Sequence, residues 1–247
     1  MKKFSLFISI LFTLSCAQEI PGLTINTGFP SPKNQFVESV AQEAFKRAKI
    51  RLNFQVLPNK RSLLNANEGI DDGDASRVWE ISDYYPNLVR VPVISSHIDI
   101  VAVANKKVEI NSPSDLSMYH VGVIHGMKIA VLLAESSKAL SVQKATDYET
   151  LIKMLVAGRL DVMLTDKVSI YKDLEMLKGL NLYLVEKPLM SRPLYLHLHK
   201  KNAAYIPQLE AAYTSMYKDG TYKRLRDEFY LPYESKLEES LILLKAH

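Results

Sequence analysis

Two arginines stand where the chain could grip an acidic ligand. Arg77 follows a turn-forming segment, and Arg61 follows Leu52–Val56, whose alternating pattern predicts a strand. A guanidinium binds a carboxylate through two parallel hydrogen bonds, which suits an organic acid or an amino acid. Arg77 could instead form a structural ion pair with an acid of Asp71–Asp74. Arg61 could be a solvated residue in the first turn of a helix.

A carboxylate stands at the end of another expected strand. Asp166 comes shortly after Leu160–Leu164, an apolar run that predicts a strand. In open α/β sheets, ligands bind beyond the carboxyl ends of the strands, so Asp166 is a candidate ligand contact. The same side chain could cap the helix that begins near Lys167, and one role does not exclude the other.

A turn before a helix offers a further candidate. His125, Gly126 and Met127 lie between an expected strand and a helix that begins at Ile129. Backbone N–H groups at a helix start favour an anion. His125 taken alone could equally be an ordinary surface histidine.

Two aromatic and two histidine side chains complete the candidates. Phe29 and Trp79 could stack on a ligand, although either could instead pack in the core or in a lid. His197 and His199 alternate, so they share one face of an expected strand, a spacing that two metal ligands can have. Because no third ligand stands nearby in the sequence, we expect neither a metal nor another cofactor.

The motifs of common enzymes are missing from the sequence. It contains no Gly-x-Ser-x-Gly elbow, no His-Glu-x-x-His pair and no glycine-rich phosphate loop. The acids of Asp71–Asp74 fall in a turn, where they are expected to be solvated or structural. Cys16 is the only cysteine, and cleavage after Ala17 would leave the mature chain with none. We therefore expect a protein that is not an enzyme.

The first part of the chain predicts strands and helices that alternate. This β-α-β-α order is typical of a parallel sheet wrapped by helices. Asn34 is the expected N-cap of the first helix, and Gly69 is expected to end the second. The expected segments are a strand over Leu23–Asn26, a helix to about Lys49, a strand over Leu52–Val56 and a short helix over Lys60–Asn67.

Long apolar runs then predict strands that carry the chain to a second α/β unit and back. The outgoing runs are Leu88–Val93 and Ile98–Ala104, and the return run is Pro193–His199. Between them we expect strands over Tyr119–Ile124, Ser141–Lys144, Leu160–Leu164 and Leu182–Val185, with helices over Ile129–Leu140, Tyr148–Ala157 and Ile170–Lys178. After the return we expect a helix from Pro207, a break at Gly220, more helix over Tyr222–Phe229 and a loosely packed terminal helix over Ser235–His247.

Residues 1–17 have the form of a signal peptide. Lys2 and Lys3 precede a short apolar run, and small residues follow at a cleavage site after Ala17. This predicts export to the periplasm. Two alternatives remain at this point: a short membrane anchor, and lipid attachment at Cys16, whose surroundings partly match a lipoprotein processing site.

Composition excludes several classes of partner. Hydrophobic residues make up 47% and charged residues 23% of the 247-residue chain, as in ordinary globular proteins. Removing Lys2 and Lys3 leaves 29 basic residues against 27 acidic ones, so the mature net charge is +2. That charge, without a basic stripe, argues against nucleic-acid binding. Beyond residue 17, no apolar run approaches the roughly 20 residues of a membrane span.

The order of the elements and several strings resemble the bacterial extracellular solute-binding proteins of family 3, which bind polar amino acids for ABC transporters. The resemblance covers roughly residues 23–230. Gly126-Met127-Lys128 stands where the family has Gly-Thr-Thr, so the fold transfers but the amino-acid ligand does not. The strings are Ser114-Asp115-Leu116, Val121-Gly122-Val123, Leu155–Met163 with Asp166, and Lys218–Tyr222 with Arg224-Leu225.

The resemblance implies an α/β protein of the type II periplasmic-binding fold, with two lobes of mixed sheet joined by two crossover strands. Lobe 1 would comprise residues 18–100 and 195–247, and lobe 2 residues 101–194. Hinges would lie near Val93–Ala104 and Leu194–His199, and Asp166 would bind a ligand ammonium.

The expected function is capture of an amino acid or related organic acid between the lobes for ABC-type uptake. We expect a monomer that docks on an inner-membrane permease. The alternatives are a periplasmic sensing component that docks on a sensor protein, and a small-molecule lyase on the same fold.

Overall fold

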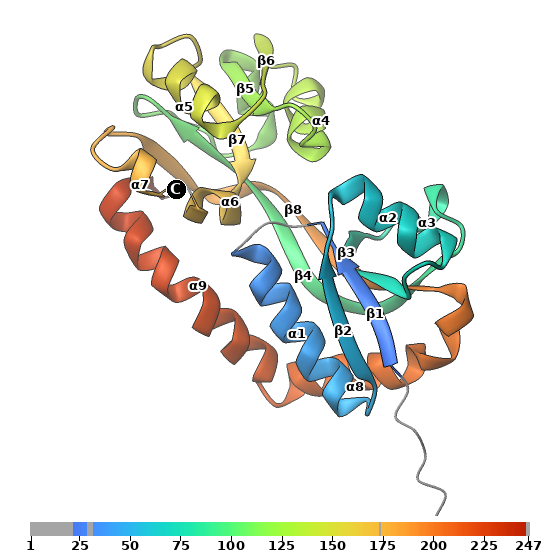
Figure 1. The fold of residues 1–247 in the computed structure, drawn as a ribbon. Coiled ribbons are helices and arrows are strands. Elements are labelled where there is room, and N and C mark those ends of the chain that lie inside the picture. The colour runs from blue at the N-terminus through green and yellow to red at the C-terminus, as the bar shows by residue number, and fades with distance from the viewer. Residues whose placement is uncertain (1–21, 29–31, 173, 246–247) are drawn as a thin grey trace, which may run out of the picture.

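The computed structural model describes residues 22–28, 32–172 and 174–245, which form two lobes (Figure 1). The predicted signal peptide, residues 1–17, lies outside the described residues. The elements of lobe 1 are β1 (Gly22–Thr27), α1 (Lys33–Arg47), β2 (Arg51–Val56), α2 (Asn59–Glu68), β3 (Gly73–Val78), α3 (Ile81–Tyr84), a 3-10 helix (Lys200–Tyr205) and α8 (Ile206–Lys218).

Lobe 2 repeats the alternation of strands and helices. Its elements are a 3-10 helix (Pro113–Met118), β5 (His120–Ile124), α4 (Lys128–Ser136), β6 (Ser141–Ala145), α5 (Tyr148–Val156), β7 (Val162–Asp166), α6 (Lys167–Lys172) and α7 (Leu174–Leu177). Two long strands, β4 (Leu88–Ala104) and β8 (Tyr183–His199), cross between the lobes. The chain ends with α9 (Thr221–Ser240) and β9 (Ile242–Leu244).

One mixed sheet runs through both lobes. The described strands lie in the order β2-β1-β3-β8-β4-β7-β5-β6, and β9 pairs with β8. Strands β1, β2 and β3 are parallel, as are β5, β6 and β7, whereas β4 and β8 run antiparallel to each other and to their neighbours β7 and β3. This arrangement confirms the predicted α/β class with two lobes and two crossover strands.

The crossover strands are longer than the sequence pattern predicts. Leu88–Val93 and Ile98–Ala104 are two parts of β4, and Leu182–Val185 and Pro193–His199 fall almost entirely within β8. The pairing of β4 with β8 shifts register between Arg90 and Ile94, between Ile94 and Ser96, and between Ile100 and Ala102. Such irregularities bend and twist a strand pair locally.

The cores explain why apolar runs form these strands. Successive side chains of a strand point to opposite faces, so Ile100 and Ala102 pack in one core while Val101 and Val103 pack in another. Helices cover both faces of the sheet in lobe 2, which is why β4 is a continuous apolar run over Ile100–Ala104 there. A separate core forms lobe 1, where the apolar face of α1 meets the sheet.

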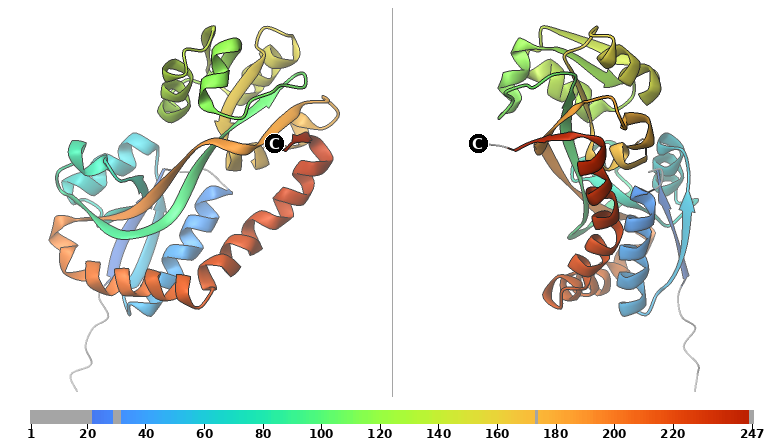
Figure 2. Two further views of the ribbon diagram at one scale, coloured as in Figure 1. Left: turned by 180° about the vertical axis from the view of Figure 1, so that it is seen from behind. Right: turned by 90° about the vertical axis from the view of Figure 1, so that its left-hand side faces the viewer.

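Helix α9 spans the two lobes (Figure 2). Phe229 packs on the core of lobe 1, Leu237 lies in a core of lobe 2, and Tyr230 contacts both. Strand β9 then pairs in parallel with Tyr183–Val185 of β8. The prediction of a helix from Ser235 is confirmed as far as Ser240, where α9 ends. The prediction that this end is loosely packed and helical to His247 was wrong, because Leu237 and Leu241 are buried and Ile242–Leu244 form a strand. We therefore propose that the end of the chain belongs with lobe 2, and that only part of 195–247 belongs with lobe 1.

The predicted end of α2 is correct, and a side-chain cap is also present at the start of α5. Gly69 ends α2 with a left-handed backbone, φ +73°, and the Asp147 carboxylate accepts a hydrogen bond from the Thr150 N–H at the start of α5. The Asn34 cap was wrong, because α1 begins at Lys33, after Pro32. None of the described helices combines the length and the apolar character needed to cross a membrane.

Candidate functional site

Three carboxyl-terminal strand ends meet at one edge of lobe 1. Gly28 follows β1, Asn59 begins α2 just after β2, and Arg77 lies near the end of β3. The Arg77 Nη1 donates to Asn59 Oδ1 at 2.9 Å. A Cβ placed on Gly28 would lie 1.9 Å from the same oxygen, so glycine lets this loop pass against Asn59. In parallel sheets this is the edge where ligands bind.

Arg77 forms a structural ion pair with Asp74, which is one of the two roles that the sequence left open. Its Nη2 lies 2.7 Å from Asp74 Oδ2, and the Asp74 side chain is completely buried. Ser62 donates its hydroxyl to the same carboxylate, and the Ser76 N–H donates to the other oxygen at 3.3 Å. The guanidinium is thus held by Asp74 and Asn59, and a role in ligand binding stays a prediction.

The other acids of the turn also serve the structure. Asp71 Oδ2 accepts hydrogen bonds from Asn26 and Asn65, each at 2.9 Å. Asp72 accepts the Thr24 N–H at 2.8 Å and lies 3.1 Å from the Lys201 Nζ. Burial alone would raise the pKa of Asp72, but these hydrogen bonds outweigh it and lower that pKa. These acids fix the loops around β1 and β3.

The two lobes meet at a buried ion pair. Lys33, the first residue of α1 in lobe 1, places its Nζ 3.4 Å from Oδ2 of Asp166, the last residue of β7 in lobe 2. Their side chains are only 4% and 6% exposed. Ser169 in α6 also donates to Asp166, at 3.5 Å. Burial raises the pKa of Asp166, and the charge of Lys33 opposes that shift.

The sequence patterns singled out Asp166 but missed Lys33. One signal was available, because Lys33 stands four residues before Val37 and seven before Val40, on the buried face of α1. Residues at that spacing share one side of a helix. A charge on an otherwise apolar face needs a partner, although the pattern cannot say which one.

A pocket of about 260 Å³ takes its walls from both lobes. Two of its wall residues are close in sequence to the ion pair: Lys167 directly follows Asp166, and Phe36 lies one helical turn after Lys33. Glu234 in its wall lies 3.8 Å from Lys167 and 3.7 Å from Arg226. We call this the interlobe pocket; its lining residues are Phe36, His97, Asp99, Lys167, Val168, Tyr171, Ser191, Tyr222, Arg226, Tyr230 and Glu234.

None of the predicted site residues lines the interlobe pocket among the described parts of the chain. The turn at His125 is exposed, with the His125 N–H bonded to the Ala145 carbonyl at 2.7 Å and Gly126 at φ +91°. Met127 immediately precedes α4. Arg61 is exposed on α2. Their roles in ligand binding stay predictions.

Of the two aromatic candidates, Trp79 packs against side chains of the crossover strands. The Arg90 guanidinium lies 2.9 Å from the centre of the Trp79 ring, a cation–π contact, and Tyr195 meets the same ring edge-on at 5.3 Å. The Trp79 ring is thereby in contact with β4 and β8, although it is 49% exposed. Phe29 lies outside the described residues.

The two alternating histidines lie in different surroundings. His197 is completely buried, and its Nδ1 lies 3.1 Å from the Tyr195 carbonyl. Burial lowers the pKa of His197 to about 4, so the ring is neutral at pH 7. His199 accepts the Lys201 N–H. Over residues 22–28, 32–172 and 174–245, no group of three or more His, Cys, Asp or Glu side chains is arranged to hold a metal.

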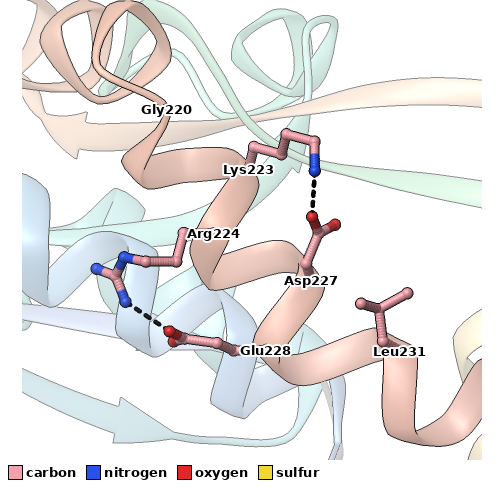
Figure 3. Close-up of a pocket in the computed structure, with 6 residues that line it drawn as sticks. All are labelled: Gly220, Lys223, Arg224, Asp227, Glu228 and Leu231. Atoms are coloured by element: carbon pink, nitrogen blue, oxygen red, sulfur yellow. Dashed lines mark hydrogen bonds and ion pairs between the residues drawn. The ribbon is translucent and has the colours of Figure 1, made fainter.

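A second hollow, of about 450 Å³, lies on α9 alone (Figure 3). Its charged side chains pair along the helix, Lys223 with Asp227 and Arg224 with Glu228. Leu231 lines its other end. The hollow takes no residue from a second element, so it is a poorer candidate for a small ligand than the interlobe pocket.

The sequence matches no known protein-family model and no curated protein sequence. Solved structures match most of the chain. The L-cystine solute receptor of Neisseria gonorrhoeae, unliganded and open, is 17% identical with a TM-score of 0.65 over 86% of this chain and 93% of that one. The GluR0 ligand-binding core with L-glutamate is 14% identical with a TM-score of 0.67 over 85% and 99%.

A histidine kinase sensor domain similar to periplasmic binding proteins also matches. It is 12% identical with a TM-score of 0.65, over 85% of this chain and 96% of that one. Identities this low establish the fold and leave the ligand open. They agree with the fold that the sequence resemblance implies. The chain has the two-lobed fold of periplasmic binding proteins.

Proposed function

We propose that this chain is a solute-binding protein of the periplasm that closes its two lobes on a small polar ligand. The observation that carries the proposal is the buried meeting of Lys33 and Asp166, which come from opposite lobes beside a pocket walled by both. A ligand bound there contacts both lobes and favours the closed arrangement by its greater affinity for it. The predicted signal peptide, residues 1–17, would export the protein.

The ligand we propose is an amino acid or a related organic acid. A pocket of about 260 Å³ suits a compact polar molecule. The similar solved structures are described as binding L-cystine and L-glutamate. None of the predicted contacts lines this pocket in the described parts of the chain. Asp166, which directly precedes Lys167 of its wall, remains the proposed polar contact, and Arg77 and the turn at His125 would contact the ligand at the strand ends outside the pocket. The chain would bind its ligand without changing it.

Uptake through an inner-membrane ABC permease is the proposed role, with the protein acting as a monomer. A sensing role is the second candidate, and the similarity to a histidine kinase sensor domain favours it. The gene neighbourhood separates the two: permease and ATPase genes would support uptake, whereas a kinase or cyclase gene would support sensing. A lyase on this fold would reveal itself by consuming its ligand.

The test is thermal melting of the chain from residue 18 against amino acids, organic acids and small amines. A ligand at 100 times its dissociation constant adds about 2.7 kcal/mol to the free energy of unfolding. We expect one chemical class to raise the melting temperature, and Asp166→Ala to remove that rise. Lys223→Ala, on the far hollow of α9, is the matched control and should retain it.

The ligand-induced rise is compared within each variant, because Asp166→Ala changes the basal stability as well. The absence of any rise across the library would contradict ligand capture. A rise that Asp166→Ala leaves unchanged would place the ligand away from the meeting point of the lobes.

A further inference from the structure

We propose that Lys33 supplies from within the protein the ammonium that pairs with Asp166, so that the interlobe site accepts organic acids lacking an amino group and rejects amino acids. This inference rests on the proposed function, because it names the chemical class of ligand for the same site. It departs from our expectation that Asp166 binds the ammonium of a ligand.

The geometry places the lysine where a ligand cation would otherwise go. Asp166 ends β7 at the carboxyl edge of the sheet of lobe 2, where ligands of such sheets bind. The Lys33 Nζ reaches it from lobe 1 at 3.4 Å, and both side chains are more than nine-tenths buried. The ion pair therefore spans the boundary that a ligand must also span.

Charge balance then decides which ligands fit. Within the buried pair, the negative charge of Asp166 is matched by the positive charge of Lys33; the neighbouring Asp99 carboxylate, whose charge also acts on Asp166, is only partly buried. A ligand ammonium brought to the same carboxylate would be a second buried cation facing one anion, and a buried charge without its own partner is strongly disfavoured. An acid with a hydroxyl or a hydrogen in place of the amino group avoids that repulsion.

The two acids of the interlobe pocket, Glu234 and Asp99, offer no easier partner for a ligand ammonium. Glu234 lies between two cations, 3.8 Å from Lys167 and 3.7 Å from Arg226. Asp99 accepts the Ser191 hydroxyl at 2.6 Å and is partly exposed, so solvent weakens its attraction for a cation.

The experiment compares matched pairs of compounds on the wild-type protein and on Lys33→Met. The pairs are L-glutamate with glutarate and 2-hydroxyglutarate, L-aspartate with succinate and malate, and L-alanine with lactate. Calorimetry measures each dissociation constant. We expect the wild type to prefer the acid without an amino group by about 100-fold within the pair it binds.

Lys33→Met keeps an unbranched side chain that is one heavy atom shorter and removes the ammonium, so the ligand ammonium can take the vacated place. We expect the preference within the pair to reverse toward the amino acid. Lys33→Arg keeps the charge and should keep the wild-type preference. Lys33→Met with Asp166→Asn leaves no buried charge at this point, and we expect it not to gain amino-acid binding; this variant also serves if the single change does not fold.

The outcomes separate this inference from the proposed function. Tighter binding of the amino acid by the wild type overturns the inference and leaves ligand capture standing. An unchanged preference in Lys33→Met does the same. If no compound of any pair binds either protein and no member of the melting library raises the melting temperature, the proposed function and the inference fail together.

Discussion

At the scale of single residues, the buried histidine of β8 links stability to pH. Burial lowers the pKa of His197 to about 4 from an ordinary value of 6.5, so the unfolded chain takes up a proton at a higher pH than the folded one. The stability it contributes is complete above about pH 6.5 and is lost as the pH falls toward 4, by about 3 kcal/mol.

The first prediction follows from the lowered pKa of His197, which makes the folded state less stable as the pH falls. Relative to His197→Gln, which cannot titrate here, the wild type should lose about 3 kcal/mol of unfolding free energy between pH 7 and pH 4. Urea unfolding at several pH values measures the difference. Parallel curves for wild type and His197→Gln would contradict the assignment.

The second prediction concerns the ion pair of β3. Arg77→Met leaves the fully buried Asp74 carboxylate without its cation, which should cost about 3–5 kcal/mol of unfolding free energy. Adding Asp74→Asn removes the orphaned charge and should restore much of that loss. Urea unfolding of both variants measures it. A double variant as unstable as the single one would mean that the cost arises from lost packing.

Some residues of the candidate site could be predicted from the sequence and others could not. The rule that ligands bind at strand ends led to Asp166 and Arg77, and the acids near Arg77 led to its partner among Asp71–Asp74. Lys33 was not predicted as a site residue, because its partner Asp166 lies 133 residues away and their pairing depends on how the lobes meet. Sequence spacing carries no information about such a contact.

At the scale of elements, α9 ties the end of the chain to lobe 2. Leu237 on this helix is 3% exposed in the core of lobe 2, whereas Leu231, less than two turns earlier, is 52% exposed. The third prediction is that Leu237→Ala costs about 2–5 kcal/mol of unfolding free energy, while Leu231→Ala stays within about 0.5 kcal/mol. Urea unfolding of the two variants provides the comparison; equal effects would contradict the packing of α9.

Elements were predicted well where a periodic pattern or a cap marks them. The crossover strand β4 was predicted in two pieces because Ser95 and Ser96 interrupt its apolar run. In the fold these hydroxyls are buried and bonded: Ser95 donates to the carbonyls of Ala75 and Leu194, and Ser96 pairs with Ser76. Polar residues inside a strand resemble a loop in sequence until their partners on other strands are known.

At the scale of the whole molecule, the shared sheet and α9 should make the two lobes unfold together. Tyr230 packs on the cores of both, and β4 and β8 pass through both. Trp79, the only tryptophan, lies in lobe 1, so its fluorescence follows that lobe, whereas far-ultraviolet circular dichroism follows the whole chain.

The fourth prediction is that these two signals change at the same urea concentration, as a two-state transition requires. The measurement is made without ligand on the chain from residue 18. Midpoints that differ between the two signals would indicate lobes that unfold independently, and would contradict a coupling role for α9.

The paths of the first and last strands have a practical consequence. Strand β1 begins in lobe 1, whereas β9 is the neighbour of β8 in lobe 2. A donor dye attached near Gly22 and an acceptor dye attached near Leu244 would therefore be located on different lobes. Energy transfer between them would report lobe motion directly, which would make the protein a fluorescent sensor for whatever solute it captures.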